Sequence, residues 1–339
     1  MQSTAHSLSD LDDVSSLTGK RILVTGSRGY LGSQLTLLLR QVDCELILFD
    51  RTAVNAAENA PSDRATVIRK AGDVSEPASF ADLLGDVEVI FHLAAVDSVR
   101  VGYDPIRDLQ VNSLGVLNLL EACRQQCPAA HVLFTSSTNL YGLLKELPAD
   151  ELAPIVPPSL WSLHKSFAEG YFRTYADLYG IASTVIRVAN IYGPSASPEV
   201  SARMALNWII QNAIRTGEIW LYPNCDCIRD YLHVDDAARA IVSLATRERS
   251  LEQISDTYIV ASGDGKTFRE IFELVASSIV QVVDRRVQLR EKEGVEMTPL
   301  DMRNFVADIG KISAHTGWHP RIGLEFGIRS TVDHYSRFS

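Results

Sequence analysis

The sequence predicts an α/β fold, in which a doubly wound parallel sheet of the Rossmann type carries a smaller, interleaved α/β C-terminal domain. Two observations indicate it. Short apolar runs alternate with helical patterns through the first half of the chain, as in parallel sheets that helices cover on both faces. Glycines follow the first apolar run directly, where a strand would give way to a helix.

The expected elements follow a regular order up to Gly193 and a looser one after it. The first predicted strand is residues 21–25 and the first helix 30–41. Further strands are expected at 45–50, 66–70, 87–95, 131–137 and 183–190, with helices over about 105–127 and 159–180. The second half predicts a helix at 200–216, a strand at 219–222, a helix from Val234, a strand at 258–262, a helix from Thr267 and a strand at 286–290.

Charge and composition exclude several classes of protein. The net charge of -10 argues against nucleic acid as a partner, because its phosphates attract a basic face. No apolar run approaches the ~18 residues of a membrane span, and the N-terminus does not resemble a secretory signal. The five cysteines are an odd number without metal-site spacing. We therefore expect a cytoplasmic protein that binds neither membrane nor metal.

The segment Thr25–Gly32, with the sequence TGSRGYLG, predicts a dinucleotide site. Its glycines permit a tight turn and a close approach of the backbone to a pyrophosphate, and the following helix offers N–H donors. Asp50 ends the second strand, where a carboxylate binds a ribose 2′-hydroxyl and repels a 2′-phosphate. NAD is therefore favoured over NADP, although Arg51 argues the other way. The candidate cofactor residues here are Gly26, Arg28, Gly29, Tyr30, Leu31, Gly32, Asp50 and Arg51.

Further motifs follow in a specific order. His92-Leu93-Ala94-Ala95 comes after the fourth predicted strand, 136–142 (SSTNLYG) after the fifth and 187–194 (RVANIYGP) after the sixth, before 229–236 (RDYLHVDD) and 317–320 (GWHP). From about Lys20 to the C-terminal helix, the chain thus resembles extended short-chain dehydrogenases/reductases of the NAD-dependent epimerase/dehydratase type, whose typical members act on nucleotide sugars. The resemblance implies further cofactor contacts at Asp73, Val74, Leu93, Ala94, Ala95, Asn112 and Lys165.

These motifs also define the expected domains. Residues 1–18 form a predicted flexible leader. Residues 19–190 form the predicted NAD-binding domain, to which 228–262 return. Residues 191–227 and 263–339 are expected to bind mainly the substrate.

The catalytic positions depart from the family pattern at one residue. Family chemistry uses a serine and a Tyr-x-x-x-Lys motif, and Ser137 and Lys165 match the serine and the lysine. Trp161 occupies the tyrosine position. An indole N–H only donates a hydrogen bond, so Trp161 cannot be the general base. Asp97, Tyr141, Tyr103 and His164 are candidates for that role, as is Lys165 if burial lowers its pKa; the residues alone leave the choice open.

The resemblance also bears on the substrate. It implies contacts of Asn190 and Arg229 with a nucleotide diphosphate, and Asp301 matches an epimerase aspartate. Thr298 stands where such epimerases often carry an arginine, so the resemblance does not define which nucleotide the substrate carries. Thr138 and Asn139 replace the carboxylates that dehydratases use, so epimerase-like or simple redox chemistry is favoured over dehydration. A homodimer through the helices near 105–127 and 159–180 is implied as well.

Three functions remain open. The first is an NAD-dependent enzyme, epimerase-like or an oxidoreductase, that modifies a nucleotide sugar with an atypical acid/base. The second is a related NAD-dependent enzyme with a non-redox or non-sugar reaction, and the third is a catalytically inactive, NAD-binding regulatory scaffold. Ser137 and Lys165 stand at the family spacing, which favours the first function, since a protein without catalytic activity does not need both residues.

Overall fold

A seven-stranded sheet is the centre of the fold in the computed structural model, which describes residues 14–52, 63–96, 103–195, 197–248 and 254–338. The strand order is β10-β6-β5-β4-β1-β2-β3, and the pairings that join β3, β2, β1, β4 and β5 are parallel. The strands are β1 Arg21–Thr25, β2 Glu45–Asp50, β3 Thr66–Ala71, β4 Val89–His92, β5 His131–Ser137, β6 Ser183–Val188 and β10 Ser255–Val260. The predicted Rossmann-type sheet is confirmed.

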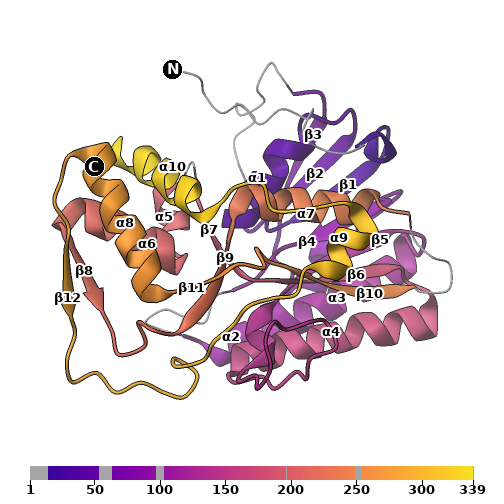
Figure 1. The fold of residues 1–339 in the computed structure, drawn as a ribbon. Coiled ribbons are helices and arrows are strands. Elements are labelled where there is room, and N and C mark those ends of the chain that lie inside the picture. The colour runs from indigo at the N-terminus through magenta and orange to yellow at the C-terminus, as the bar shows by residue number, and fades with distance from the viewer. Residues whose placement is uncertain (1–13, 53–62, 97–102, 196, 249–253, 339) are drawn as a thin grey trace. The chain divides into compact units, whose positions relative to one another are not determined.

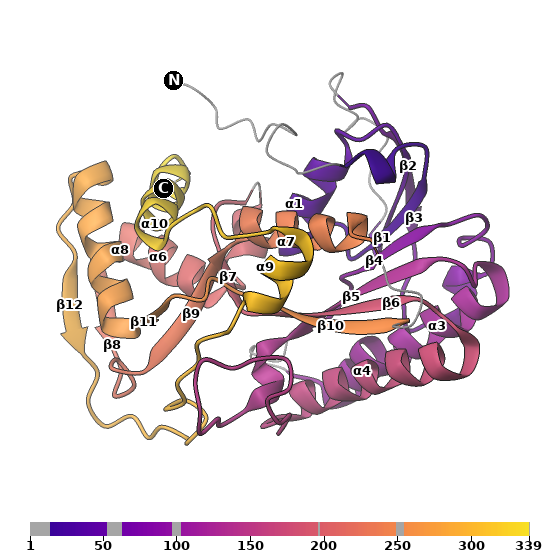
Figure 2. The ribbon, with the colours of Figure 1, turned by 45° about the vertical axis from the view of Figure 1, so that its right-hand side comes forward.

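Helices cover both faces of this sheet. Helices α3 (Gly115–Gln126) and α4 (Leu160–Tyr179) lie on one face, and α1 (Tyr30–Leu39) and α7 (Val234–Thr246) lie on the other (Figures 1 and 2). Every residue of β4 and β6 is buried, as expected for strands of a parallel sheet that helices cover on both faces.

The helix expected over about 105–127 is interrupted. It consists of α2 (Pro105–Leu109), a π-helical turn at Gln110–Leu114 and then α3. A π-helical turn inserts one residue into the helix and often marks a functional site. Asn112 lies in this turn and is fully buried, so the insertion rotates a polar side chain into the interior.

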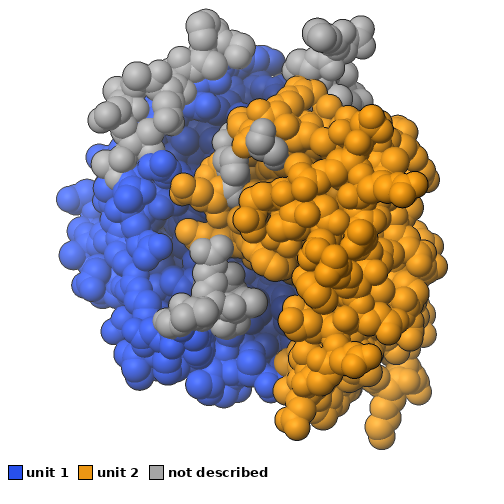
Figure 3. All heavy atoms as spheres, turned by 90° about the vertical axis from the view of Figure 1, so that its left-hand side faces the viewer, with its two compact units in different colours: residues 1–140, 157–187, 238–258 blue, residues 141–156, 188–237, 259–339 orange. Residues whose placement is uncertain are grey.

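The chain forms two compact units, coloured separately in Figure 3. Unit 1 comprises residues 1–140, 157–187 and 238–258, and unit 2 comprises 141–156, 188–237 and 259–339. This division differs from the expected domains at 141–156, 188–190, 228–237 and 259–262. Ala149 bonds the backbone of Val306 and Asp308, and β9 pairs within a sheet of unit 2, which explains the differences at 141–156 and 228–237. Of the predicted flexible leader, Leu17 is fully buried, and residues 1–13 lie outside the described residues.

Unit 2 is the predicted smaller α/β domain. Strands β7 (Asn190–Tyr192), β9 (Ile228–His233) and β11 (Gly265–Thr267) form one sheet, and β8 (Glu218–Leu221) pairs with β12 (Gln288–Glu291). Its helices are α5 Pro198–Ser201, α6 Ala205–Thr216, α8 Phe268–Val283, α9 Gly310–Thr316 and α10 Leu324–Ser336. The strand predicted at 183–190 is therefore two strands, because Asn190 pairs with Tyr231 of β9 in a separate sheet.

One buried ion pair fixes α4 against the sheet of unit 1. Arg187 of β6 donates to Glu169 of α4 at 2.8 Å, and both side chains are 4% exposed. Replacing Glu169 by leucine is expected to lower the free energy of unfolding by about 3–5 kcal/mol, because a guanidinium would stay buried without its carboxylate. Urea unfolding measures the change.

The matched control for this ion pair is Glu218, which bonds Arg290 at the surface. Replacing Glu218 by leucine should cost no more than about 1 kcal/mol. Equal unfolding free energies for the Glu169 and Glu218 variants would contradict the assigned importance of the buried pair.

No helix among the described residues combines the length and the apolar composition needed to cross a membrane.

Candidate cofactor and catalytic site

The turn between β1 and α1 is built so that only glycine fits. Gly26 has a φ of 69°, and a Cβ there would lie 2.6 Å from the Ala94 nitrogen. A Cβ on Gly32 would lie 2.1 Å from the carbonyl oxygen of Gly26. Gly29 begins α1 as an N-cap residue without a side-chain cap, and the first turn holds no acidic residue. The positive end of the helix dipole therefore suits a phosphate.

Asp50 lies beside this turn at the end of β2. Its carboxylate accepts the backbone N–H of Arg28 at 3.1 Å and that of Arg51 at 2.8 Å. The Arg28 guanidinium donates to Thr52 at 3.3 Å. Both arginine side chains are exposed. A carboxylate retains further acceptor sites after two such bonds, so Asp50 can still bind a ribose hydroxyl, and the glycine turn, the helix terminus and the carboxylate together fit a dinucleotide.

The segment after β4 forms a wall beside the glycine turn. The backbone N–H of Leu93 donates to the Thr25 carbonyl at 3.1 Å, and that of Ala94 donates to the Thr25 hydroxyl at 3.3 Å. Ala95 is exposed. His92 is fully buried, and burial together with the charge of Lys165 lowers its pKa to about 3. The imidazole is therefore neutral and serves the packing of β4.

Asp73 and Val74 make contacts within unit 1. The Asp73 carboxylate accepts the hydroxyl and the backbone N–H of Ser75 at 2.7 and 2.9 Å, and it pairs with Arg107. Val74 is buried and lies against Gly115. These contacts explain why the motif stays in place, and the expected contacts of both residues with a cofactor stay predictions.

Asn112 and Asp108 form a buried polar cluster, of which the sequence pointed only to Asn112. The Asn112 amide donates to Asp108 at 2.6 Å and to the Val96 carbonyl at 3.0 Å. Asp108 is fully buried and also accepts the hydroxyl of Tyr103, while His164 Nδ1 lies 3.2 Å from it. Asp108 was missed because a single aspartate inside a helical pattern reads as a solvent-facing residue.

Trp161 and Lys165 lie one turn apart on α4, so they share a face of the helix. The Trp161 indole N–H donates to the Val96 carbonyl at 2.8 Å. Lys165 is 3% exposed; its ammonium donates to the Thr135 carbonyl at 3.1 Å and lies 4.8 Å from the centre of the Phe134 ring. Burial lowers the pKa of Lys165 to about 8, although Asp108 and Glu169 oppose the shift. A pKa in this range suits a proton carrier near neutral pH.

Ser137 ends β5 and precedes a short helical turn. Its hydroxyl oxygen accepts the backbone N–H of Asn139 at 3.1 Å. This bond leaves the hydroxyl proton for another acceptor. Ser137, Trp161 and Lys165 all belong to unit 1, as the predicted site requires.

The structure shows the surroundings of three of the four other residues that the sequence offers as a general base. Tyr141 is fully buried in unit 2, and its hydroxyl donates to the Asp150 carbonyl at 3.0 Å. These contacts favour a packing role, and the expected catalytic role of Tyr141 stays a prediction. Burial and Asp108 raise the pKa of Tyr103 to about 12, so this tyrosine ionises only at strongly alkaline pH. His164 faces Asp108 instead of sharing the face of Lys165. Asp97 lies outside the described residues.

The predicted substrate residues meet within unit 2. The Arg229 guanidinium donates to the carbonyls of Ile228 at 3.0 Å and Asp301 at 2.9 Å, and also to that of Arg303. The Asp301 carboxylate accepts the Thr298 hydroxyl at 2.7 Å. Arg229 therefore fixes the segment around Asp301, and its contact with a diphosphate stays a prediction.

A second arginine in unit 2 was missed by the sequence reasoning. Burial and the charge of Arg229 lower the pKa of Arg303 to about 10, so two guanidinium groups share one region. Its position two residues after Asp301, itself a predicted substrate residue, is the sequence feature that could have indicated Arg303. Asn190, also predicted to bind substrate, donates to the Asp230 carbonyl at 3.5 Å.

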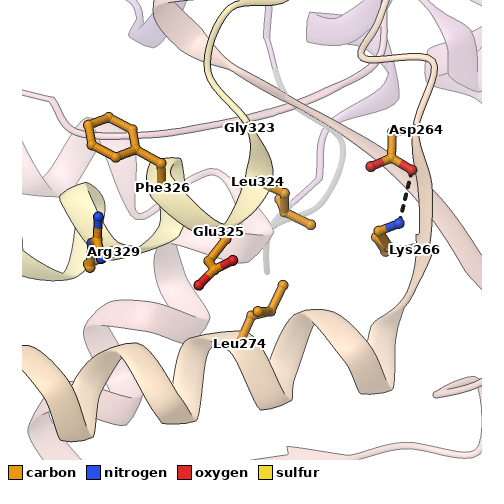
Figure 4. A pocket seen from close by; sticks show the side chains of 8 residues that line it. All are labelled: Asp264, Lys266, Leu274, Gly323, Leu324, Glu325, Phe326 and Arg329. Atoms are coloured by element: carbon orange, nitrogen blue, oxygen red, sulfur yellow. Dashed lines mark hydrogen bonds and ion pairs between the residues drawn. The ribbon is translucent and has the colours of Figure 1, made fainter.

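Unit 2 also holds an open pocket of about 650 Å³ between β11, α8 and α10 (Figure 4). Leu274 and Leu324 supply apolar surface, and an ion pair of 3.0 Å joins Lys266 to Asp264 at its edge. Phe326 and Arg329 complete one side. None of the predicted cofactor, catalytic or substrate residues lines this pocket.

Comparison with known proteins gives one consistent result. The protein-family model described as GDP-mannose 4,6 dehydratase matches residues 23–331. A putative UDP-glucose 4-epimerase of Methanocaldococcus jannaschii is 27% identical over 316 residues, which cover 92% of this chain and 97% of that protein.

Two solved structures extend the likeness to three dimensions. The UDP-glucose 4-epimerase of Thermotoga maritima with UDP-glucose has a TM-score of 0.80 and 26% identity, over 94% of this chain and 99% of the other. The UDP-glucose 4-epimerase of Thermus thermophilus in complex with NAD has a TM-score of 0.73 and 31% identity, over 93% and 98%.

Proposed function

Because the chain belongs to the family described as GDP-mannose 4,6 dehydratase, among the extended short-chain dehydrogenases/reductases as its motifs predict, we propose that it is an NAD-dependent enzyme that modifies a nucleotide sugar. The observation that carries this proposal is the glycine turn beside Asp50, with Lys165 buried in the same unit. Similar proteins bind NAD or UDP-glucose, which supports both ligands. NAD, when bound, supplies redox chemistry at a sugar carbon.

The glycine turn and α1 would hold the pyrophosphate, and Asp50 a ribose hydroxyl. Two backbone N–H groups already fix the carboxylate of Asp50, so it needs little reorganisation. A carboxylate at this position disfavours a 2′-phosphate, which supports NAD over NADP.

Lys165 is the proton carrier in this proposal. Its neutral amine would accept the proton of a sugar hydroxyl, and its ammonium would return a proton later. Desolvation disfavours the charged form of a buried lysine, and the pKa of about 8 leaves a useful fraction neutral near pH 8. Ser137 would donate its hydroxyl proton to the sugar oxygen, since its own oxygen already accepts from Asn139.

Epimerase-like or simple redox chemistry is favoured over dehydration. Elimination of water in this family uses a carboxylate directly after the serine, and this chain has Thr138 and Asn139 there. Thr138 is buried and neither residue carries a charge. The loss of the carboxylate therefore supports a reaction without elimination.

We also propose a cytoplasmic homodimer. All five cysteines are free thiols, which suits a reducing compartment. Large apolar side chains are exposed along α2, the π-helical turn and α4, and such patches are typical of an interface between protein chains. They are Ile106, Leu109, Leu114, Leu160, Phe167, Leu178 and Tyr179.

Two measurements test the proposed function. Mass spectrometry of the small molecules that denatured protein releases should identify NAD. The protein should then convert one member of a panel of UDP-, dTDP- and GDP-sugars, with the product followed by proton NMR. Binding of NAD and of a nucleotide sugar without any conversion would favour the regulatory scaffold, and absence of both ligands would contradict the proposal.

A further inference from the structure

Both polar groups of one backbone residue, Val96, are held by side chains from two helices. Its carbonyl accepts the indole N–H of Trp161 at 2.8 Å and the amide of Asn112 at 3.0 Å. Its N–H donates to the amide oxygen of Asn112 at 3.2 Å. We call these three hydrogen bonds the Val96 clamp.

We propose that Trp161 is a positioning residue, which through the Val96 clamp holds the wall of the dinucleotide site. This inference rests on the proposed function. Val96 directly follows Leu93, Ala94 and Ala95, and the first two are bonded to Thr25 of β1. The clamp therefore fixes the outer end of a four-residue segment whose inner end contacts the glycine turn.

The wall and the turn touch with no spare room. A Cβ on Gly26 would lie 2.6 Å from the nitrogen and 2.8 Å from the Cα of Ala94. A displacement of residues 93–96 toward the turn would therefore push directly on Gly26. A displacement away from it would open the wall that a bound dinucleotide needs. The position of Trp161 thus reaches the cofactor turn through a short path of backbone contacts.

The chemistry of the indole suits this role. It offers one N–H and no acceptor, so a carbonyl is its natural partner. The orientation of Asn112 is fixed as well, because its amide also donates to the buried Asp108 at 2.6 Å. The Asn112 oxygen is thereby directed to the Val96 N–H. In this chain the residue at the family's proton-carrying position has become a donor to the backbone, which is consistent with Lys165 as the proton carrier.

The test replaces Trp161 by phenylalanine, which keeps an aromatic ring and removes the N–H. Calorimetric titration with NAD should give a Kd raised by up to about 10-fold, the full worth of one hydrogen bond, because NAD must then order a wall that the indole no longer holds. The pH dependence of turnover should not change, because the indole of Trp161 does not ionise in the accessible pH range. Trp208, exposed on α6 of unit 2, provides the matched control: its phenylalanine variant should bind NAD like the wild type.

A second measurement needs no variant of Trp161. In wild-type protein labelled with ¹⁵N at its indoles, hydrogen exchange of the Trp161 N–H should slow when NAD binds, since the wall becomes more rigid. An unchanged exchange rate, or an unchanged Kd for W161F, overturns the inference and leaves the proposed function standing. A wild-type protein that binds no dinucleotide overturns both.

Discussion

Replacing Lys165 by methionine is expected to lower kcat by about 10²–10⁴-fold, the range that general acid–base catalysis contributes. Methionine fills a similar volume and has no proton to exchange. The wild type should show kcat/KM that rises with pH and levels off above about 8, because burial lowers the pKa of Lys165 to about 8 and only the neutral amine accepts a proton. Steady-state rates across this pH range measure both effects.

Two further variants separate chemistry from binding at this position. Lys165→Arg keeps a cation that stays protonated at every accessible pH, so it should retain NAD binding and lose turnover. Lys145, exposed in unit 2, is the control, and its methionine variant should match the wild type. A Lys165→Met enzyme with wild-type kcat and an unchanged pH profile would show that another group carries the proton.

Replacing Gly32 by alanine should weaken NAD binding by up to roughly 100-fold. The added Cβ would lie 2.1 Å from the Gly26 carbonyl oxygen and 3.1 Å from the Ser27 Cα. These are backbone atoms, so no side chain can move aside and the turn itself must shift. Overpacking of this kind costs about 1–3 kcal/mol, and 3 kcal/mol corresponds to somewhat more than 100-fold in Kd. Calorimetric titration with NAD measures it.

Gly170 is the matched control for this substitution. It lies in the middle of α4, and a Cβ there would have no neighbour within 4 Å. Alanine at this position should leave the Kd unchanged and raise the unfolding free energy by about 0.5–1 kcal/mol, because glycine is a poor helix former. A Gly32→Ala protein that binds NAD like the wild type would contradict the assignment of the turn.

The sheet and the glycine turn were predictable because their signals are local. The apolar run 21–25 predicts a buried strand, the glycines after it predict a tight turn, and Asp50 lies at the end of the next apolar run. Each of these features is visible within a few consecutive residues. The break between β6 and β7 was not predictable. The pattern of residues 183–189 holds no sign that the strand ends, and only the partner of β7, which is β9, places β7 in another sheet.

The hydrogen-bond partners of the site residues were beyond the sequence for a similar reason. The indole of Trp161 bonds a carbonyl 65 positions away, and the guanidinium of Arg229 bonds carbonyls 72 and 74 positions away. Every residue has a backbone carbonyl, so the residue type does not reveal which carbonyl accepts a hydrogen bond, and no sequence pattern could predict these acceptors. The π-helical turn at Gln110–Leu114 was missed because its apolar spacing still reads as a continuous helix.

The most direct test of the central claim is a crystal structure of the wild-type protein with NAD and the nucleotide sugar it converts. We expect the pyrophosphate of NAD on the turn Gly26–Gly32 and the Lys165 amine about 2.6–3.2 Å from the reacting sugar hydroxyl, the reach of a general base. A complex in which Lys165 contacts only the cofactor, while a different side chain reaches that hydroxyl, would contradict the account.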